Sequence, residues 1–154
     1  MRPARPSYSH GISTTPLLGD TIGENLRRTV ERVPARDALV VRSQGRRFTY
    51  QQLWDETTAL ARALMASGVQ QGDRVGLWAP NRFEWTVTQF ATARIGAILV
   101  TINPAYKSAE LQYALAKSGV SVLLHSRGFR QSDYVSMVAD VRERCPLLRE
   151  TIVI

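Results

Sequence analysis

The sequence has 154 residues, of which 44% are hydrophobic and 21% charged, and its formal net charge is +7. This composition is typical of a soluble globular domain, and no apolar run approaches the roughly 18 residues that a transmembrane segment needs. The single cysteine excludes an internal disulfide framework and favours a reducing, cytoplasmic location. Nucleic acid is not the expected partner, because the arginines are scattered and no binding motif accompanies them.

The first twenty residues differ in composition from the rest of the chain. They contain arginine, serine and proline, and the first acidic residue is Asp20. This weakly resembles a transit peptide, but two prolines among the first six residues and the lack of an amphipathic repeat favour a flexible leader over residues 1–20. We therefore expect the folded part of the chain to be residues 21–154.

The next segment predicts two helices separated by a β-hairpin. Thr21 and Thr49 are each followed three residues later by a glutamate or glutamine, the pattern of a capping box at a helix start. Residues 38–49 predict the hairpin, with its turn at residues 43–45. Gly68 is expected to end the second helix, because glycine favours the left-handed conformation found there.

The stretch from residue 72 to residue 106 predicts a strand, a helix and a second strand. Residues 75–79 and 97–102 are short apolar runs of the kind found in buried strands. Asn81 is the expected cap of the intervening helix, with Glu84 reaching back to it, and a glycine follows the helix. Such βαβ units form parallel sheets with right-handed crossovers, so the predicted fold class is α/β with a mainly parallel sheet.

The alternation continues to the end of the sequence. Ser108 is the expected cap of the next helix, and residues 120–124 predict a third parallel strand. Ser132 is the expected cap of a last helix that carries Cys145 on its apolar side. Residues 151–154 then predict a fourth strand.

A search for catalytic chemistry finds no complete motif. The ten glycines fall singly at turns, so neither a P-loop nor a dinucleotide fingerprint is present. His10 and His125 have no partner at metal-ligand spacing, and we interpret His125, at a strand end, as structural. Cys145 is interpreted as a small buried residue. Residues 11–13 do not form a nucleophile elbow.

The three tryptophans also invite a functional interpretation. Trp54, Trp78 and Trp85 could form a stacking platform, but two lie on predicted helices and one in a strand. Roles in packing are therefore favoured.

Three segments resemble the adenylate-forming acid–CoA ligases. FTYQQLW at residues 48–54 resembles the first core motif of that family. GDRVGLWAPNRFEW at residues 72–85, followed by ARIGAILVTINPAYKSAELQYAL at residues 93–115, resembles the segment that contains the second motif. SYSHGISTTPLLGDTIGENL at residues 7–26 is further similar to the leader of the medium-chain fatty-acyl-CoA synthetases.

This resemblance implies an ATP-dependent fatty-acid–CoA ligase. The family joins a fatty acid to ATP, releases pyrophosphate, and passes the acyl group to coenzyme A with the help of Mg²⁺. The resemblance also implies that the phosphate loop and the catalytic lysine lie beyond residue 154. Residues 21–154 are therefore expected to be a partial AMP-binding domain that lacks catalysis and tight cofactor binding alone, with the remainder of the ligase as its partner. An aryl-acid ligase or a peptide-synthetase adenylation domain remains a weaker option within the family.

One residue within the chain is a candidate contact to the cofactor. Some relatives place an arginine directly after the Asn-Pro of the second motif, where it touches the nucleotide phosphates of CoA, and the matching residue here is Ala105. Lys107 is then the candidate for this contact, although a solvated lysine before a helix is the simpler interpretation. Outside the family, a stand-alone α/β module that binds a nucleotide or a partner remains an alternative, as does a basic nucleic-acid-binding protein.

Overall fold

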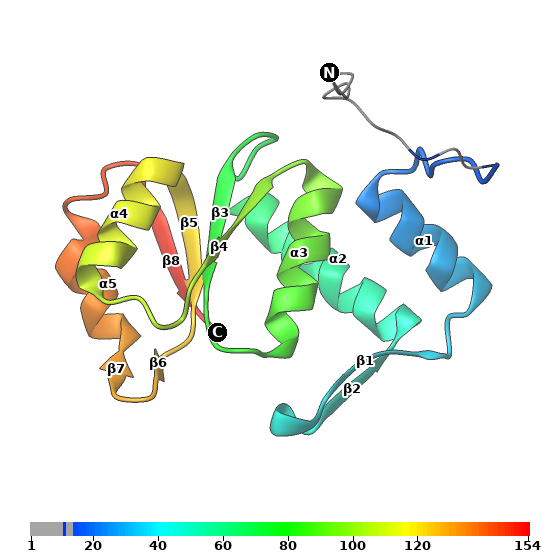
Figure 1. Ribbon diagram of the computed structural model, residues 1–154, viewed down its shortest axis with the longest axis horizontal. Helices are drawn as coiled ribbons and strands as arrows, with labels where there is room; N and C mark the ends of the chain where they lie inside the picture. Colours follow the sequence, from blue (N-terminus) through cyan, green and yellow to red (C-terminus); the bar gives the residue numbers. More distant parts are fainter. Residues whose placement is uncertain (1–10, 12–13) are drawn as a thin grey trace, which may run out of the picture.

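A four-stranded parallel sheet, in the order β4-β3-β5-β8, lies between two layers of helices (Figure 1). The computed structural model describes residue 11 and residues 14–154, so His10 and most of the expected leader lie outside the described part. The predicted α/β class with a mainly parallel sheet is confirmed. No helix in the described part is long and apolar enough to cross a membrane.

The helices and strands agree closely with the expected alternation. In chain order they are α1 (Ile22–Arg32), β1 (Asp37–Val41), the 3-10 turn η1 (Arg42–Gln44), β2 (Arg46–Thr49), α2 (Tyr50–Ala66), β3 (Arg74–Trp78), α3 (Phe83–Ile95), β4 (Ile98–Ile102), α4 (Ser108–Ser118), β5 (Val120–His125), β6 (Gly128–Phe129), β7 (Ser132–Asp133), α5 (Tyr134–Arg142) and β8 (Glu150–Val153).

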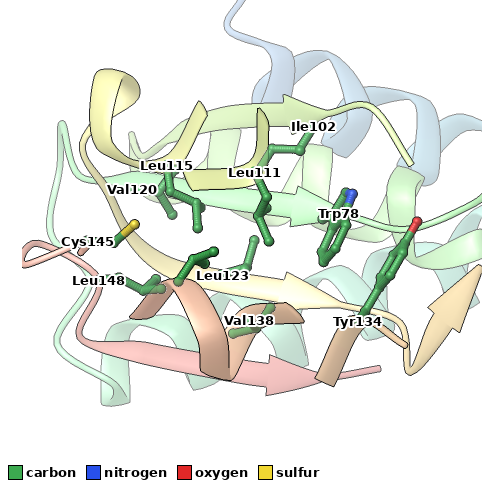
Figure 2. Close-up of a cluster of buried hydrophobic side chains, with 11 residues drawn as sticks. Trp78, Ile102, Leu111, Leu115, Val120, Leu123, Tyr134, Val138, Cys145 and Leu148 are labelled. Carbon is green, nitrogen blue, oxygen red and sulfur yellow. The ribbon is translucent and has the colours of Figure 1, made fainter. Parts of the chain in front are cut away.

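Each face of the sheet is buried by its own pair of helices. Helices α2 and α3 cover one face, where Leu64 of α2 and Ala91 of α3 pack on Val75 and Leu77 of β3. Helices α4 and α5 cover the other face with a second apolar cluster, shown in Figure 2. Parallel strands need both faces covered, and β3 and β5 are accordingly almost completely buried.

The N-terminal elements form a third apolar cluster that lies beside the sheet. Leu26 of α1 and Phe48 of β2 pack against Leu53 of α2 and Val87 of α3. Strands β1 and β2 pair antiparallel, which confirms the predicted hairpin. The capping box at Thr49 is also confirmed, since the backbone and side-chain bonds with the residue three positions later are both present.

The direction of the connections changes in the middle of the sheet. From β3 the chain passes through α3 to β4 on one side, whereas from β5 it passes through α5 to β8 on the other. Open α/β sheets bind ligands at the carboxyl ends of the strands near such a change. The loops that follow β3, β4 and β5 are therefore the part of the fold in which to seek a site.

The predicted cap of α3 is wrong. Its N-cap is Arg82 rather than Asn81, and the Arg82 side chain makes no capping hydrogen bond to the helix. The guanidinium of Arg82 binds Glu84 with Nη2 2.6 Å from Oε1, so this carboxylate is held by its neighbour instead of reaching back to Asn81. The backbone N–H of Phe83 instead donates to Oε1 of Gln44, 2.7 Å away at the hairpin tip. Gln44, which is distant in the sequence, thus provides the hydrogen-bond acceptor that a neighbouring residue was expected to provide.

Two further caps are displaced by one residue. Helix α4 has Lys107, not Ser108, at its N-cap, and Glu110 accepts the Lys107 backbone N–H at 2.8 Å. Helix α5 is capped by Asp133 rather than Ser132, because the Asp133 side chain accepts the backbone N–H groups of Val135 and Ser136. The predicted extension of α5 to Cys145 is also wrong, since α5 ends at Arg142. Pro146 disfavours helical geometry in the residue before it.

Candidate functional site

The loops after β4 and β5 enclose a pocket at the carboxyl edge of the sheet. Its volume is about 280 Å³, and it is lined by Pro104, Ala105, Lys107, Phe129, Arg130, Gln131 and Ser132. One wall is the loop that leads into α4, and the other is the β6–β7 hairpin. Two cationic side chains among these residues give the pocket its chemical character.

Lys107 reaches across the pocket to the hairpin. Its Nζ donates to Oγ of Ser132 at 2.7 Å, and its side chain is exposed. A lysine ammonium carries three donors, so the bond to Ser132 leaves others for a ligand. The structure therefore places the candidate residue Lys107 at the mouth of a pocket, in an orientation that Ser132 helps to fix. Ala105, the position that the family resemblance singles out, lines the same pocket.

Arg130 is the second cation of the pocket, and the sequence analysis did not identify it. It occupies the turn between β6 and β7, and its guanidinium carbon lies 5.0 Å from the centroid of the Phe129 ring. Within the described part of the chain, neither Arg130 nor Lys107 forms a salt bridge with a carboxylate. Arg127 and Arg130 come soon after a predicted strand, and this pattern in the sequence could have identified Arg130 as a candidate.

The wall formed by the loop after β4 is held by a stacked aromatic pair. The rings of Trp78 and Tyr134 lie 3.5 Å apart between centroids and within 6° of parallel, and Figure 2 shows them side by side. Trp78 Nε1 donates to the carbonyl of Asn103 at 3.0 Å, and the Tyr134 hydroxyl donates to the carbonyl of Pro104. Burial raises the pKa of Tyr134 to about 12, so this hydroxyl keeps its proton. Both bonds fix the backbone just before Lys107.

His125 lies at the end of β5 but does not line the pocket. It is buried, its Nδ1 lies 2.9 Å from the carbonyl oxygen of Ser126, and burial lowers its pKa. A neutral, enclosed imidazole agrees with the structural interpretation. Cys145 is likewise buried, and burial raises its pKa, so the thiol is held protonated.

The other two tryptophans also have packing partners. The Arg94 guanidinium carbon lies 3.6 Å from the centroid of the Trp54 ring, between α3 and α2. Trp85 donates through Nε1 to the carbonyls of Ala79 and Pro80 at 3.2 and 3.0 Å. The three rings lie in different places and do not form one stacking platform.

Two features that commonly hold a nucleoside triphosphate and its metal are absent from the described residues. No group of three or more His, Cys, Asp or Glu residues in this part of the chain is arranged to hold a metal ion. The strands are followed by loops without a glycine-rich run, which close approach of backbone amides to phosphates requires. Lys107 and Arg130 are the two cationic side chains in the lining of the pocket.

Comparison with known proteins places these features in a family. The model of the AMP-binding enzyme family matches residues 26–154. The mitochondrial medium-chain acyl-CoA ligase ACSF2 of Danio rerio is 39% identical over 140 residues, which are 91% of this chain and 23% of that protein. The Homo sapiens protein of the same name is 39% identical over 140 residues, 91% of this chain and 22% of that protein. The chain thus spans less than a quarter of the length of these curated relatives.

Solved structures show the same architecture. The inhibitor-bound N-terminal domain of FACL13 from Mycobacterium tuberculosis matches with a TM-score of 0.79 and 27% identity, over 87% of this chain and 33% of that one. The anthranilate CoA ligase AuaEII, solved with anthranoyl-AMP, matches with a TM-score of 0.78 and 27% identity, over 88% of this chain and 25% of that one.

Proposed function

The chain belongs to the AMP-binding enzyme family, and on this premise we propose that it forms the N-terminal portion of an ATP-dependent fatty-acid–CoA ligase. The reaction joins a fatty acid to ATP to give an acyl-adenylate and pyrophosphate. The acyl group then passes to the thiol of coenzyme A, and AMP leaves. The observation that carries this proposal is the 39% identity, over 91% of the chain, to medium-chain acyl-CoA ligases.

The chain's own part in this reaction is structural. A carboxylate oxygen is a poor leaving group until it carries AMP, and the charge that develops on the phosphates must be met by donors, a cation and a metal. The described residues offer no metal cluster and no glycine-rich loop. We therefore assign ATP and Mg²⁺ binding to the remainder of the ligase, and to residues 21–154 the frame on which that remainder is built. Alone, the chain is expected to lack catalysis.

Lys107 is proposed to contact a phosphate of coenzyme A. Its ammonium lies at the mouth of the pocket after β4, at the N-terminus of α4, where the helix dipole also favours an anion. The bond to Ser132 limits the rotamers of the side chain without neutralising its charge. These contacts support a ligand role over a freely solvated lysine.

ATP–pyrophosphate exchange with octanoate tests the proposed function. The 154-residue chain alone is expected to show no exchange, whereas the same chain extended through the rest of its reading frame is expected to exchange and to form octanoyl-CoA. Benzoate and an amino acid serve as control acids, because exchange with either in place of octanoate would favour an aryl-acid ligase or a peptide-synthetase domain. Exchange by the 154-residue chain would overturn the claim that it lacks catalysis.

Direct binding separates this proposal from a stand-alone module. Titration calorimetry of the 154-residue chain with ATP and AMP is expected to show no micromolar binding. Micromolar binding of either nucleotide would favour an independent nucleotide-binding domain. Retention on DNA that weakens as salt rises would favour the nucleic-acid alternative.

A further inference from the structure

We propose that the edge of the sheet at which its parallel strands begin is a docking surface for a bilayer that contains anionic lipids. This surface consists of the segments 67–73, 96–97 and 143–149 and the turn at Gly119, and we call it the amino face. It lies opposite to the pocket of Lys107, which is formed by loops that follow the strands. The inference does not depend on the ligase assignment, because it concerns where the chain binds and not what it catalyses.

The segments of the amino face contact one another across the edge of the sheet. The N–H of Gly72 donates to the carbonyl of Gly96 at 2.9 Å, and Nη2 of Arg149 donates to the carbonyl of Gly68 at 3.4 Å. In Figure 1 the connections into β3, β5 and β8 lie along the upper side of the sheet, whereas the β1–β2 and β6–β7 hairpins lie at the lower side. The amino face is therefore one continuous surface, separate from the candidate site.

Exposed apolar side chains surround the amino face. Met65, near the end of α2, is 59% exposed, Ile98, at the start of β4, is 48% exposed, and Leu147, just before β8, is 62% exposed. Leu147 lies beside the neighbouring turn, since a Cβ on Gly119 would be 3.6 Å from its Cδ1. The three side chains come from three different segments and present separate apolar points. Such points suit a fluid surface, which can close around each of them.

The same face carries cations that no carboxylate neutralises. They are exposed and lie near the ends of α2 and α4, at the start of β3 and in the segment before β8: Arg62, Lys117, Arg74 and Arg144. Within the described residues none of these cations forms a salt bridge, whereas Arg149 is paired with Asp73 at 3.2 Å. Burial and the nearby charge of Arg62 both lower the pKa of Arg94, so like charges lie close together here. A partner with many negative charges would relieve this repulsion.

The combination of charge and apolar points specifies the partner. Basic side chains are attracted to the negative potential of anionic head groups, and apolar side chains enter the boundary between head groups and acyl chains. A nucleic acid or an acidic protein loop would match the cations but would leave Met65, Ile98 and Leu147 in water. Docking through the amino face also leaves Lys107, at the other edge of the sheet, open to ligands from solution.

Co-sedimentation of the 154-residue chain with lipid vesicles tests the surface. The chain is expected to bind vesicles of equimolar phosphatidylcholine and phosphatidylserine about tenfold more strongly than pure phosphatidylcholine, and more weakly as salt rises. A cation near such a surface contributes about fivefold in affinity, so Arg62→Gln combined with Arg74→Gln should lower partitioning about twentyfold. Met65→Ser combined with Leu147→Ser should lower it about fivefold, because inserted apolar area is lost.

Matched controls make the same changes away from the amino face. Arg42→Gln combined with Arg127→Gln removes two exposed cations that form no salt bridge within the described residues. Val40→Ser combined with Val135→Ser removes two apolar side chains that are 46% and 43% exposed. Each control should change partitioning by less than about twofold, because these residues stay beyond the reach of a screened surface potential. Equal losses in a variant and its control would overturn the surface, as would a lack of vesicle binding at low salt.

Insertion is measured separately with a polarity-sensitive fluorophore. Cys145 is buried, so a label added to Leu147→Cys reports on the new cysteine. Its emission should shift to the blue when mixed vesicles are added, and a label on Val135→Cys should not shift. A shift at both positions or at neither would refute docking through the amino face. Retention on heparin without vesicle binding would assign the face to an acidic polymer and overturn the lipid partner.

This test is separate from that of the proposed function. Vesicle binding through the amino face without exchange by the extended protein would leave the surface in place while the ligase assignment fails. Exchange with octanoate by an extended protein that ignores anionic vesicles would have the opposite meaning.

Discussion

Removal of the Tyr134 hydroxyl is expected to loosen the pocket wall that precedes Lys107. Tyr134 is fully buried, is stacked on Trp78, and donates its hydroxyl proton to the carbonyl of Pro104. Tyr134→Phe keeps the ring, and with it the stack and the packed volume. The variant therefore removes one hydrogen bond and leaves the rest of the cluster in place.

The size of the effect follows from the surroundings of the bond. A buried hydrogen bond contributes about 0.5–1.5 kcal/mol net, and a buried acceptor left without a partner costs about 1–3 kcal/mol. Pro104 is only partly buried, so water can reach its carbonyl and the lower part of that range applies. We expect the free energy of unfolding to fall by about 1–2 kcal/mol, and the melting temperature to fall by about 2–4 °C per kcal/mol for a domain of this size.

Urea unfolding followed by tryptophan fluorescence measures this change, because Trp78 reports directly on the stack. The m-value is expected to stay constant, since the surface exposed on unfolding does not change. Tyr113→Phe is the matched control: Tyr113 is 63% exposed, so a change within about 0.5 kcal/mol is expected. Equal stabilities of the two variants would refute the idea that the Tyr134 bond holds this wall.

Three further predictions concern the interior. Burial holds the pKa of His125 below its ordinary value of 6.5, so the unfolded chain takes up a proton before the folded chain does. The free energy of unfolding should therefore fall as pH drops below about 6.5, and in urea titrations between pH 7.5 and 5.5 His125→Leu should flatten this slope. Leu115→Ala, at a side chain with 1% exposure, should lower the free energy of unfolding by about 2–5 kcal/mol in thermal denaturation. A decrease below about 1 kcal/mol would contradict the packing described. Gln44→Ala should lower the free energy of unfolding by about 1–2 kcal/mol, because the Phe83 N–H loses its acceptor. An unchanged midpoint in chemical denaturation would show that water replaces the Gln44 side chain as acceptor.

The regular elements could be predicted because local signals and the tertiary fold agree. Gly68, Gly96 and Gly119 each have a positive φ at or just beyond a helix end, where the sequence places them. The displaced caps show where local signals stop being sufficient. Phe83 takes its hydrogen-bond acceptor from Gln44, a residue 39 positions away, and no pattern around Asn81 carries that information.

The candidate site could be predicted only in part. Lys107 could be named as a candidate from its place after the Asn-Pro segment, which a family resemblance marks. Arg130 was missed because β6 and β7 have two residues each, too short for any alternation to appear in the sequence. Lys107 and Ser132 are 25 positions apart in the sequence, so only the folded chain reveals the hydrogen bond between them.

The side chains on the two faces of β3 differ in size, and this difference restricts the register of β3 with its neighbouring strands. Val75 and Leu77 face α2 and α3, whereas Trp78 lies in the cluster beneath α4 and α5. A Cβ on Gly76 would lie 3.0 Å from side-chain atoms of Val120 and Leu123, so this position leaves no spare volume. A slip of one residue would turn the indole toward α2 and α3 and push a branched side chain into the space that glycine leaves. Packing on both faces therefore allows only one register for β3. This register also fixes the position of the loop that follows the strand.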